Sequence, residues 1–358
     1  MIMPIIDNDL LERKIRSGRW EELAIGTPKL IERALENERN QEAGELATFL
    51  AGEMRVVYDI YSQWFRDTAK CLLDKGMSEA DLEHEMDVID ELLAPYHQAI
   101  GKDRADIWSD IESHLNYISD INVSTEEKLT KLAAAKDKWR DLHDCEVDQL
   151  SGLFNLVISR FGENGLLEMY EGWVIGDWFR QRYQRFDVSK IAWGEASWLL
   201  TYLGFEGHHG HFSGTHRDGS IDFEEDDEKI TISFAPCGSG GRSMEGEVRD
   251  GLPALHQKPF EWPLLEQAHD FTWNEKGICS YCAHCCILHE KLPIEHFGYP
   301  VRVTKPPVGP LTEQSRCAWT VYKDLEAIPE WAYERVGAKK PLKGVPLGST
   351  HKALREQS

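Results

Sequence analysis

From about Leu10 to Leu203 the apolar positions recur at helical spacing almost throughout. Between Leu46 and Tyr61 they fall three and four positions apart, so they share one face of an amphipathic helix. We expect this helix to run to Asp74 and to stop at Gly76, because glycine readily takes the left-handed closing conformation. No alternation rich in Val, Ile and Thr interrupts this half, which predicts a helical domain over residues 1–203.

Two serines mark the starts of further helices. Ser78 is a suitable N-cap for a helix that Pro95 ends, and Ser124 with Glu127 forms a capping box. Additional helices fit residues 147–161, 165–183 and 188–203.

The pattern changes at Gly204, where glycines, histidines and short strand-like runs take over. The runs cover residues 208–213, 220–223, 229–235, 299–304 and 318–323. In the third run Ile230, Ile232 and Phe234 share one face, as in a half-buried strand, and the acidic residues 224–228 before it predict a hairpin loop.

These elements predict an α+β fold in which a helical N-terminal half packs on a smaller C-terminal half. That C-terminal half, residues 204–336, is expected to hold an antiparallel sheet and a Cys-rich metal knuckle. Residues 337–358 are basic, are punctuated by prolines and contain few apolar positions, so we expect a loosely ordered tail.

Charge narrows the classes of partner. The chain of 358 residues has 40 Lys and Arg against 62 Asp and Glu, a formal charge of −22. Such a charge repels nucleic-acid phosphates and anionic lipids, so we expect neither nucleic acid nor membrane as a partner. No basic region precedes an apolar core at the N-terminus, which predicts a cytoplasmic protein without a secretory signal.

The cysteines carry the most specific signal. Four of the eight, Cys279, Cys282, Cys285 and Cys286, fall within eight residues. In a reducing cytoplasm such a group favours metal ligation or redox chemistry over disulfides. The Cys-x2-Cys spacing suits tetrahedral zinc, with Cys286 or His289 as the fourth ligand.

The spacing of these cysteines leaves open which metal they bind and which of them are ligands. The same spacing also begins many iron–sulfur sites, in which a remote cysteine completes the set, and here Cys237 or Cys317 could do so. Because the adjacent Cys285 and Cys286 cannot easily face one ion, we expect one of them to be a bystander. Zinc is therefore the expected cofactor, with an iron–sulfur cluster as the alternative.

Histidines concentrate just before the sheet. If residues 208–213 form a strand, His209 and His211 project from one face, with His208 on the other. Two imidazoles on one strand face are a common pair of metal ligands, and without metal they can act as acid and base. We therefore expect His209 and His211 to be catalytic.

A glycine-rich turn follows the third strand-like run. Backbone N–H groups of Gly238, Ser239, Gly240 and Gly241 could hold an anionic oxygen, and Arg242 could bind a carboxylate or phosphate. Cys237 occupies the position of a nucleophile. The turn matches neither the phosphatase loop nor the dinucleotide-binding fingerprint.

Aromatic residues crowd the two helices before the histidines and could wall a ligand pocket, with Trp193 as a substrate contact. They could bury a homo-oligomer interface equally well. Together the motifs predict a metal-dependent hydrolase or lyase acting on a small polar or anionic metabolite. A small-molecule sensor with a structural zinc or redox-active cysteines is the first alternative, and an iron–sulfur redox protein the second.

Overall fold

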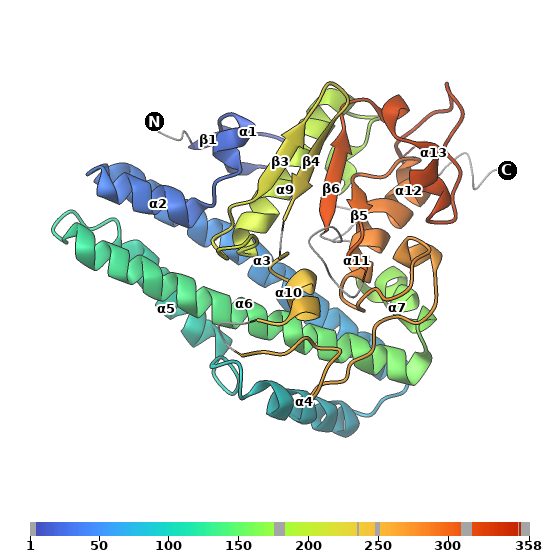
Figure 1. The fold of residues 1–358 in the computed structure, drawn as a ribbon, viewed down its shortest axis with the longest axis horizontal. Helices are drawn as coiled ribbons and strands as arrows, with labels where there is room; N and C mark the ends of the chain where they lie inside the picture. The colour runs from blue at the N-terminus through green and yellow to red at the C-terminus, as the bar shows by residue number, and fades with distance from the viewer. Residues whose placement is uncertain are drawn as a thin grey trace.

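Two long helices form the base of the molecule. The computed structural model describes residues 5–174, 183–234, 236–247, 251–308, 317–349 and 351. Helices α3 (Asn40–Asp74) and α6 (Thr125–Phe161) lie side by side along its length (Figure 1). The shorter helices of this half are α1 (Trp20–Leu23), α2 (Thr27–Glu36), α4 (Glu79–Leu93), α5 (Arg104–Tyr117) and α7 (Asn164–Met169).

The expected helix signals operate in this half. Ser78 accepts a hydrogen bond from the Asp81 backbone, Ser124 and Glu127 complete a capping box, and Gly76 has a φ of +101°. The helix expected over residues 147–161 is the second part of the uninterrupted α6. Only Asn164–Met169 and a π-turn, η1 (Tyr170–Val174), represent the helix expected over 165–183, of which residues 175–182 lie outside the described ranges.

The prediction of helix almost from Leu10 onwards is wrong at its start. Strands β1 (Ile5–Asn8) and β2 (Arg13–Arg16) form an antiparallel hairpin. Charged residues in these short strands hide the alternation that would reveal them. The Arg16 side chain is fully buried, and its guanidinium donates to the backbone oxygens of Glu22 and Ile25 at 2.8 and 2.9 Å.

The C-terminal half contains the expected antiparallel sheet, which confirms the α+β class. Its strands are β3 (Asp222–Glu225), β4 (Lys229–Ser233), β5 (Val303–Lys305) and β6 (Ala318–Tyr322), in the order β3-β4-β6-β5. The pairing of β3 with β4 confirms the predicted acidic hairpin. In β4, Ile230 and Ile232 are buried while Thr231 is only partly so, as the alternation predicts.

Helix α9 (Trp193–Gly210) contacts both α3 and the sheet. The strand expected over residues 208–213 is therefore wrong, because residues 208–210 are the last turn of this helix. Glycine explains why the helix fits here: a Cβ on Gly210 would lie 2.7 Å from Val57 Cγ2 and 2.8 Å from the Glu53 backbone oxygen. The domain boundary predicted after residue 203 falls inside α9.

Short elements complete the fold. They are η2 (Gln184–Phe186), α10 (Gly240–Glu245), η3 (Asp270–Thr272), α11 (Ala283–Cys286), the π-turn η4 (Ile287–Lys291), α12 (Leu292–Phe297), η6 (Leu325–Ala327) and α13 (Glu330–Glu334). Part of the segment expected as a loose tail is tethered, since Gly348 donates to the Phe297 oxygen and Ser349 to Asp187. None of the described helices could span a bilayer.

Candidate functional site

The end of α9, the glycine turn before α10 and the cysteine segment leading into α11 meet at a cavity of about 40 Å³. We call it the thiol cavity. It is large enough for an ion, since a single water needs roughly 10–15 Å³ by the same measure. It is lined by His208, His211, Phe234, Cys237, Ser239, Gly240, Gly241, Tyr281, Cys282, His284, Cys285, Pro307, Cys317 and Trp319.

The four cysteines of the thiol cavity come from three separate segments. Cys237 belongs to the glycine turn, Cys282 and Cys285 to the cysteine segment, and Cys317 lies next to the start of β6. Cys279 does not line the cavity but lies beside it, because its sulfur accepts a hydrogen bond from the Cys282 backbone at 3.2 Å.

Glycine is required where the turn meets the sulfurs. A Cβ on Gly240 would lie 2.5 Å from Cys282 Sγ and 3.7 Å from Cys279 Sγ. The first distance is far below van der Waals contact, so any side chain at this position would displace a sulfur. Gly240 thus allows the backbone of the turn to approach the cysteine segment closely.

Three of the four cavity thiols, Cys282, Cys285 and Cys317, are protonated in this arrangement. Burial raises the pKa of Cys285 and of Cys317 well above the usual range, and a hydrogen bond with Cys279 together with burial does the same for Cys282. Over the described ranges, no group of three or more His, Cys, Asp or Glu side chains is arranged to hold a metal ion. The thiols therefore line a common space without converging on one point.

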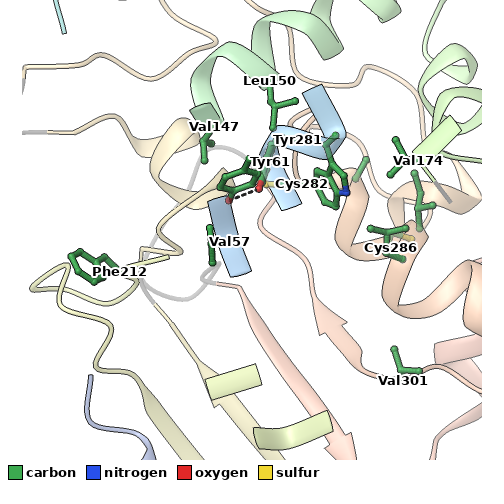
Figure 2. Packing of buried hydrophobic residues seen from close by; sticks show 14 of the residues in the cluster. Val57, Tyr61, Val147, Leu150, Val174, Phe212, Tyr281, Cys282, Cys286 and Val301 are labelled. Atoms are coloured by element: carbon green, nitrogen blue, oxygen red, sulfur yellow. Dashed lines mark hydrogen bonds between the residues drawn. The ribbon is translucent and has the colours of Figure 1, made fainter. Parts of the chain in front are cut away.

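Two members of the expected metal set lie elsewhere. Cys286 Sγ accepts from the Trp273 backbone at 3.3 Å, and Figure 2 shows it well apart from Cys282. Successive residues of a helix differ in direction by roughly 100°, so Cys285 and Cys286 face different surroundings. His289 Nδ1 lies 2.9 Å from the Tyr183 hydroxyl and outside the thiol cavity.

The clustered histidines also separate. Because His208 and His209 are helical, they turn to different sides of α9 rather than alternating as in a strand. His209 Nδ1 lies 2.9 Å from Glu53 Oε1 and His209 does not line the thiol cavity, whereas His211 does, so the expected pairing of the two does not form.

His208, which the strand assumption placed on the opposite face, lines the thiol cavity. Its Nδ1 lies 2.9 Å from Ser213 Oγ, and its ring packs on Phe234 with centroids 3.6 Å apart. Its Nε2 is buried and has no hydrogen-bond partner among the described residues. Burial holds the pKa of His208 well below its usual value, so the ring is neutral.

The glycine turn is tied down on both sides. The Gly238 N–H donates to Ser213 Oγ at 2.9 Å, so it is not available to an anion. Arg242 is fully buried and pairs with Asp148 and Asp144 of α6, so it does not line the thiol cavity. The guanidinium therefore anchors the turn to α6 in this structure.

A second cavity, of about 110 Å³, adjoins the first; we call it the aromatic cavity. The two share His211, Tyr281, His284 and Trp319 as a common wall. Trp193 lines neither, because its Nε1 donates to the Tyr322 oxygen at 3.0 Å. The aromatic cavity is lined by Glu53, Val56, Val57, Ile60, Tyr61, Trp64, Tyr183, Phe186, Leu200, Leu203, Glu206, Gly207, His211, Tyr281, His284, Leu288, His289, Arg302 and Trp319.

Behind the common wall lies a group that the sequence analysis missed. His211 Nδ1 lies 3.0 Å from His143 Nε2 and 2.9 Å from the Tyr61 hydroxyl. The Tyr281 hydroxyl donates to that of Tyr61 at 2.9 Å, the hydrogen bond drawn in Figure 2. A run of polar residues over 143–149, interrupted by Cys145 and Val147 in the middle of a buried helix, was the available signal.

The two cavities thus bring together thiols, neutral imidazoles and, through Arg302, a cation. Comparison of the chain with known protein families, curated proteins and solved structures finds no match.

Proposed function

We propose that the protein is a cytoplasmic, metal-dependent enzyme that binds zinc through thiolates at the thiol cavity. Its substrate is a small polar or anionic metabolite in the aromatic cavity, and the reaction is hydrolysis or lyase-type cleavage. One observation carries the proposal: Cys237 and Cys317, remote in sequence, line the same cavity as Cys282 and Cys285.

Four thiols match the ligand number that tetrahedral zinc requires. Because these thiols do not yet converge on one point, their side chains must close on the ion as it displaces the protons. Cys279 is available to replace one of the four, since its sulfur adjoins Cys282. His208 Nε2 is a further candidate ligand, because it is unprotonated when Nδ1 carries the proton.

The neighbouring aromatic cavity suits a small substrate. Arg302 is on its wall, with the guanidinium 4.5 Å from the Trp319 ring centroid, and supplies the positive charge that an anionic group would meet. A zinc ion held by only three of the thiols would keep its fourth position open, and there it would act as a Lewis acid or generate a hydroxide at neutral pH. The common wall would bring the two sites close enough for that chemistry.

An iron–sulfur redox protein is the second candidate, and the same cavity favours it. The Cys-x2-Cys-x2-Cys segment needs a remote fourth thiol in such a site, and both Cys237 and Cys317 line the cavity with Cys282 and Cys285. A cluster would also use more of the cavity than a single ion.

Elemental analysis of anaerobically purified protein tests the proposal, together with its absorbance spectrum. We expect one zinc per chain and a colourless solution. If the protein is brown and contains iron and sulfide, it is the iron–sulfur redox protein and not the zinc enzyme. If the protein contains neither metal and takes up neither on reconstitution, the metal function is wrong.

Two cysteine variants locate the site. Cys282→Ser is expected to lower metal affinity at least about tenfold, because it removes a cavity thiol. Cys286→Ser is the matched control and should keep wild-type stoichiometry, because that sulfur faces Trp273. Equal loss in both variants would show that the metal does not bind at the thiol cavity.

A further inference from the structure

Asp144, in the middle of α6, is a buried carboxylate held between two guanidinium groups. Arg217 approaches its Oδ1 at 2.7 Å and Arg242 at 3.5 Å. Burial alone would raise the pKa of Asp144, but the two guanidinium groups hold it well below its usual range. Asp144 is therefore ionised and can only accept hydrogen bonds.

The charge on Asp144 determines where His143 carries its proton. His143 Nδ1 lies 2.8 Å from Asp144 Oδ1, so this nitrogen must be the donor. Burial lowers the pKa of His143, and the nearby Arg217 and Arg242 disfavour another positive charge. The ring is thus neutral, with a lone pair on Nε2.

The lone pair of His143 in turn determines the proton position on His211. The two nitrogens that face each other, His143 Nε2 and His211 Nδ1, are 3.0 Å apart, so one of them must carry a proton. Because His143 Nε2 is the acceptor, the proton is on His211 Nδ1. Burial also holds the pKa of His211 well below its usual value, so Nε2 of this ring is unprotonated.

Tyr61 contacts the same nitrogen of His211. Its oxygen lies 2.9 Å from His211 Nδ1 and accepts from Tyr281, so it can share the His211 proton. The Ser239 hydroxyl also interacts with the Tyr61 hydroxyl. Ser239 Oγ lies 3.1 Å from Cys237 Sγ, so the network reaches the thiol cavity.

We infer that Asp144 and His143 are positioning residues that hold His211 in the Nδ1–H form, so that its Nε2 is the proton acceptor at the wall shared by the two cavities. His211 lines both cavities. Its Nδ1 edge is occupied by His143 and Tyr61, which leaves the Nε2 edge for a bound molecule. This deepens the proposed function and rests on it for the identity of that molecule, a weakly acidic small metabolite.

The proton movement is balanced without any further reactant. A weakly acidic O–H or N–H of the bound molecule gives its proton to His211 Nε2 and keeps the electron pair. His211 Nδ1 then passes its proton to His143 Nε2. The resulting positive charge on His143 lies against the Asp144 carboxylate, as in other carboxylate–histidine pairs.

The tautomer can be measured without substrate or metal. Full-length protein labelled at its histidine nitrogens is studied at neutral pH by long-range proton–nitrogen correlation, with His211→Gln used to assign the signal. We expect His211 in the Nδ1–H form in about tenfold excess, the effect of one net hydrogen bond. Wild-type protein in the Nε2–H or doubly protonated form would overturn the inference.

Variants of the partner test the cause. His143→Leu removes the acceptor and should shift His211 towards Nε2–H, whereas His143→Gln keeps an acceptor oxygen and should restore the Nδ1–H form. His269→Gln, which breaks another histidine–carboxylate pair, with Glu163, should leave the His211 signal unchanged. An unchanged tautomer in His143→Leu contradicts the positioning role. Metal content is measured separately, so its absence would contradict only the proposed function.

Discussion

The middle of α6 and the walls of the two cavities both bury polar side chains, but they satisfy them differently. In α6 two buried carboxylates form ion pairs: Asp148 pairs with Arg242 and His97, and Asp144 with Arg217. At the cavities, His208 Nε2 and Glu53 Oε2 are buried without a partner among the described residues.

This difference separates a role in stability from a role in binding. Removing one member of a buried ion pair leaves an uncompensated charge, so paired groups hold one arrangement in place. An unpaired buried group already carries the cost of desolvation, which a bound ligand can offset. We therefore expect the ion pairs of Asp148 in α6 to control folding and the cavity groups to control binding.

The largest effect is expected for the ion pair between α6 and the glycine turn. Asp148→Ala leaves the fully buried Arg242 without its closest partner and should lower the free energy of unfolding by about 3–5 kcal/mol in urea titrations. Glu85→Ala, which breaks a largely exposed pair with Arg160, is the control and should cost less than about 1 kcal/mol. If the two variants lose similar amounts of unfolding free energy, the buried ion pair has no special role in stability.

His97 is expected to make the free energy of unfolding depend on pH, by nearly the same amount. Burial alone would lower the pKa of His97, but Asp141 and Asp148 raise it to about 9. Because this lies above the unfolded value of about 6.5, the stabilisation is full below that pH and is lost as the pH rises through about 9. It amounts to about 3 kcal/mol.

His97→Gln isolates this contribution. The gap in unfolding free energy between wild type and variant should be widest near pH 6 and should nearly close by about pH 10. A gap that does not change with pH would mean that His97 is not charged in the folded protein.

A smaller effect is expected at the contact between the glycine turn and the sulfurs. Gly240→Ala places a methyl group 2.5 Å from Cys282 Sγ and should weaken zinc binding about tenfold, measured by competition with a chelator. Gly207→Ala is the control, because its added Cβ meets nothing within 4 Å. If Gly240→Ala binds zinc with wild-type affinity, the close contact between Gly240 and Cys282 does not matter for metal binding.

The smallest effect on the free energy of unfolding is expected for Glu53 of the aromatic cavity, of which only one carboxylate oxygen has a partner. Glu53→Gln keeps the oxygen that faces His209 and replaces the partnerless Oε2, so the free energy of unfolding should stay within about 0.5 kcal/mol or rise. Glu290→Gln provides the contrast, because Glu290 binds Arg335, Trp273 and the Thr304 backbone. That variant should lose about 2 kcal/mol.

The regular parts of the fold could be predicted because their signals are local. The caps at Ser78 and Ser124 and the alternation in β4 depend on residues a few positions apart, and each has its expected structure. The β1–β2 hairpin was missed because a buried arginine, Arg16, occupies a core position that hydrophobicity does not reveal.

The candidate site could be predicted only in part because its contacts are remote. Sequence reasoning selected Cys237, Cys282, Cys285 and His211, which lie on the thiol cavity. It also selected His209, whose assignment depended on a strand that is a helix. The roles of His143 and Tyr61 depend on distances between α6, α3 and the end of α9, which no spacing along the chain encodes.

Helix α9 crosses the predicted division of the chain, and this has a consequence for how the protein unfolds. Gly210 packs on α3, and a Cβ on Gly204 would lie 2.6 Å from Ile232 of β4. One continuous helix therefore packs closely against both halves. Cleaving the chain after residue 203 would divide α9 and leave its last turns on the C-terminal fragment. Neither fragment is then expected to persist alone, and calorimetry should record one cooperative melting event.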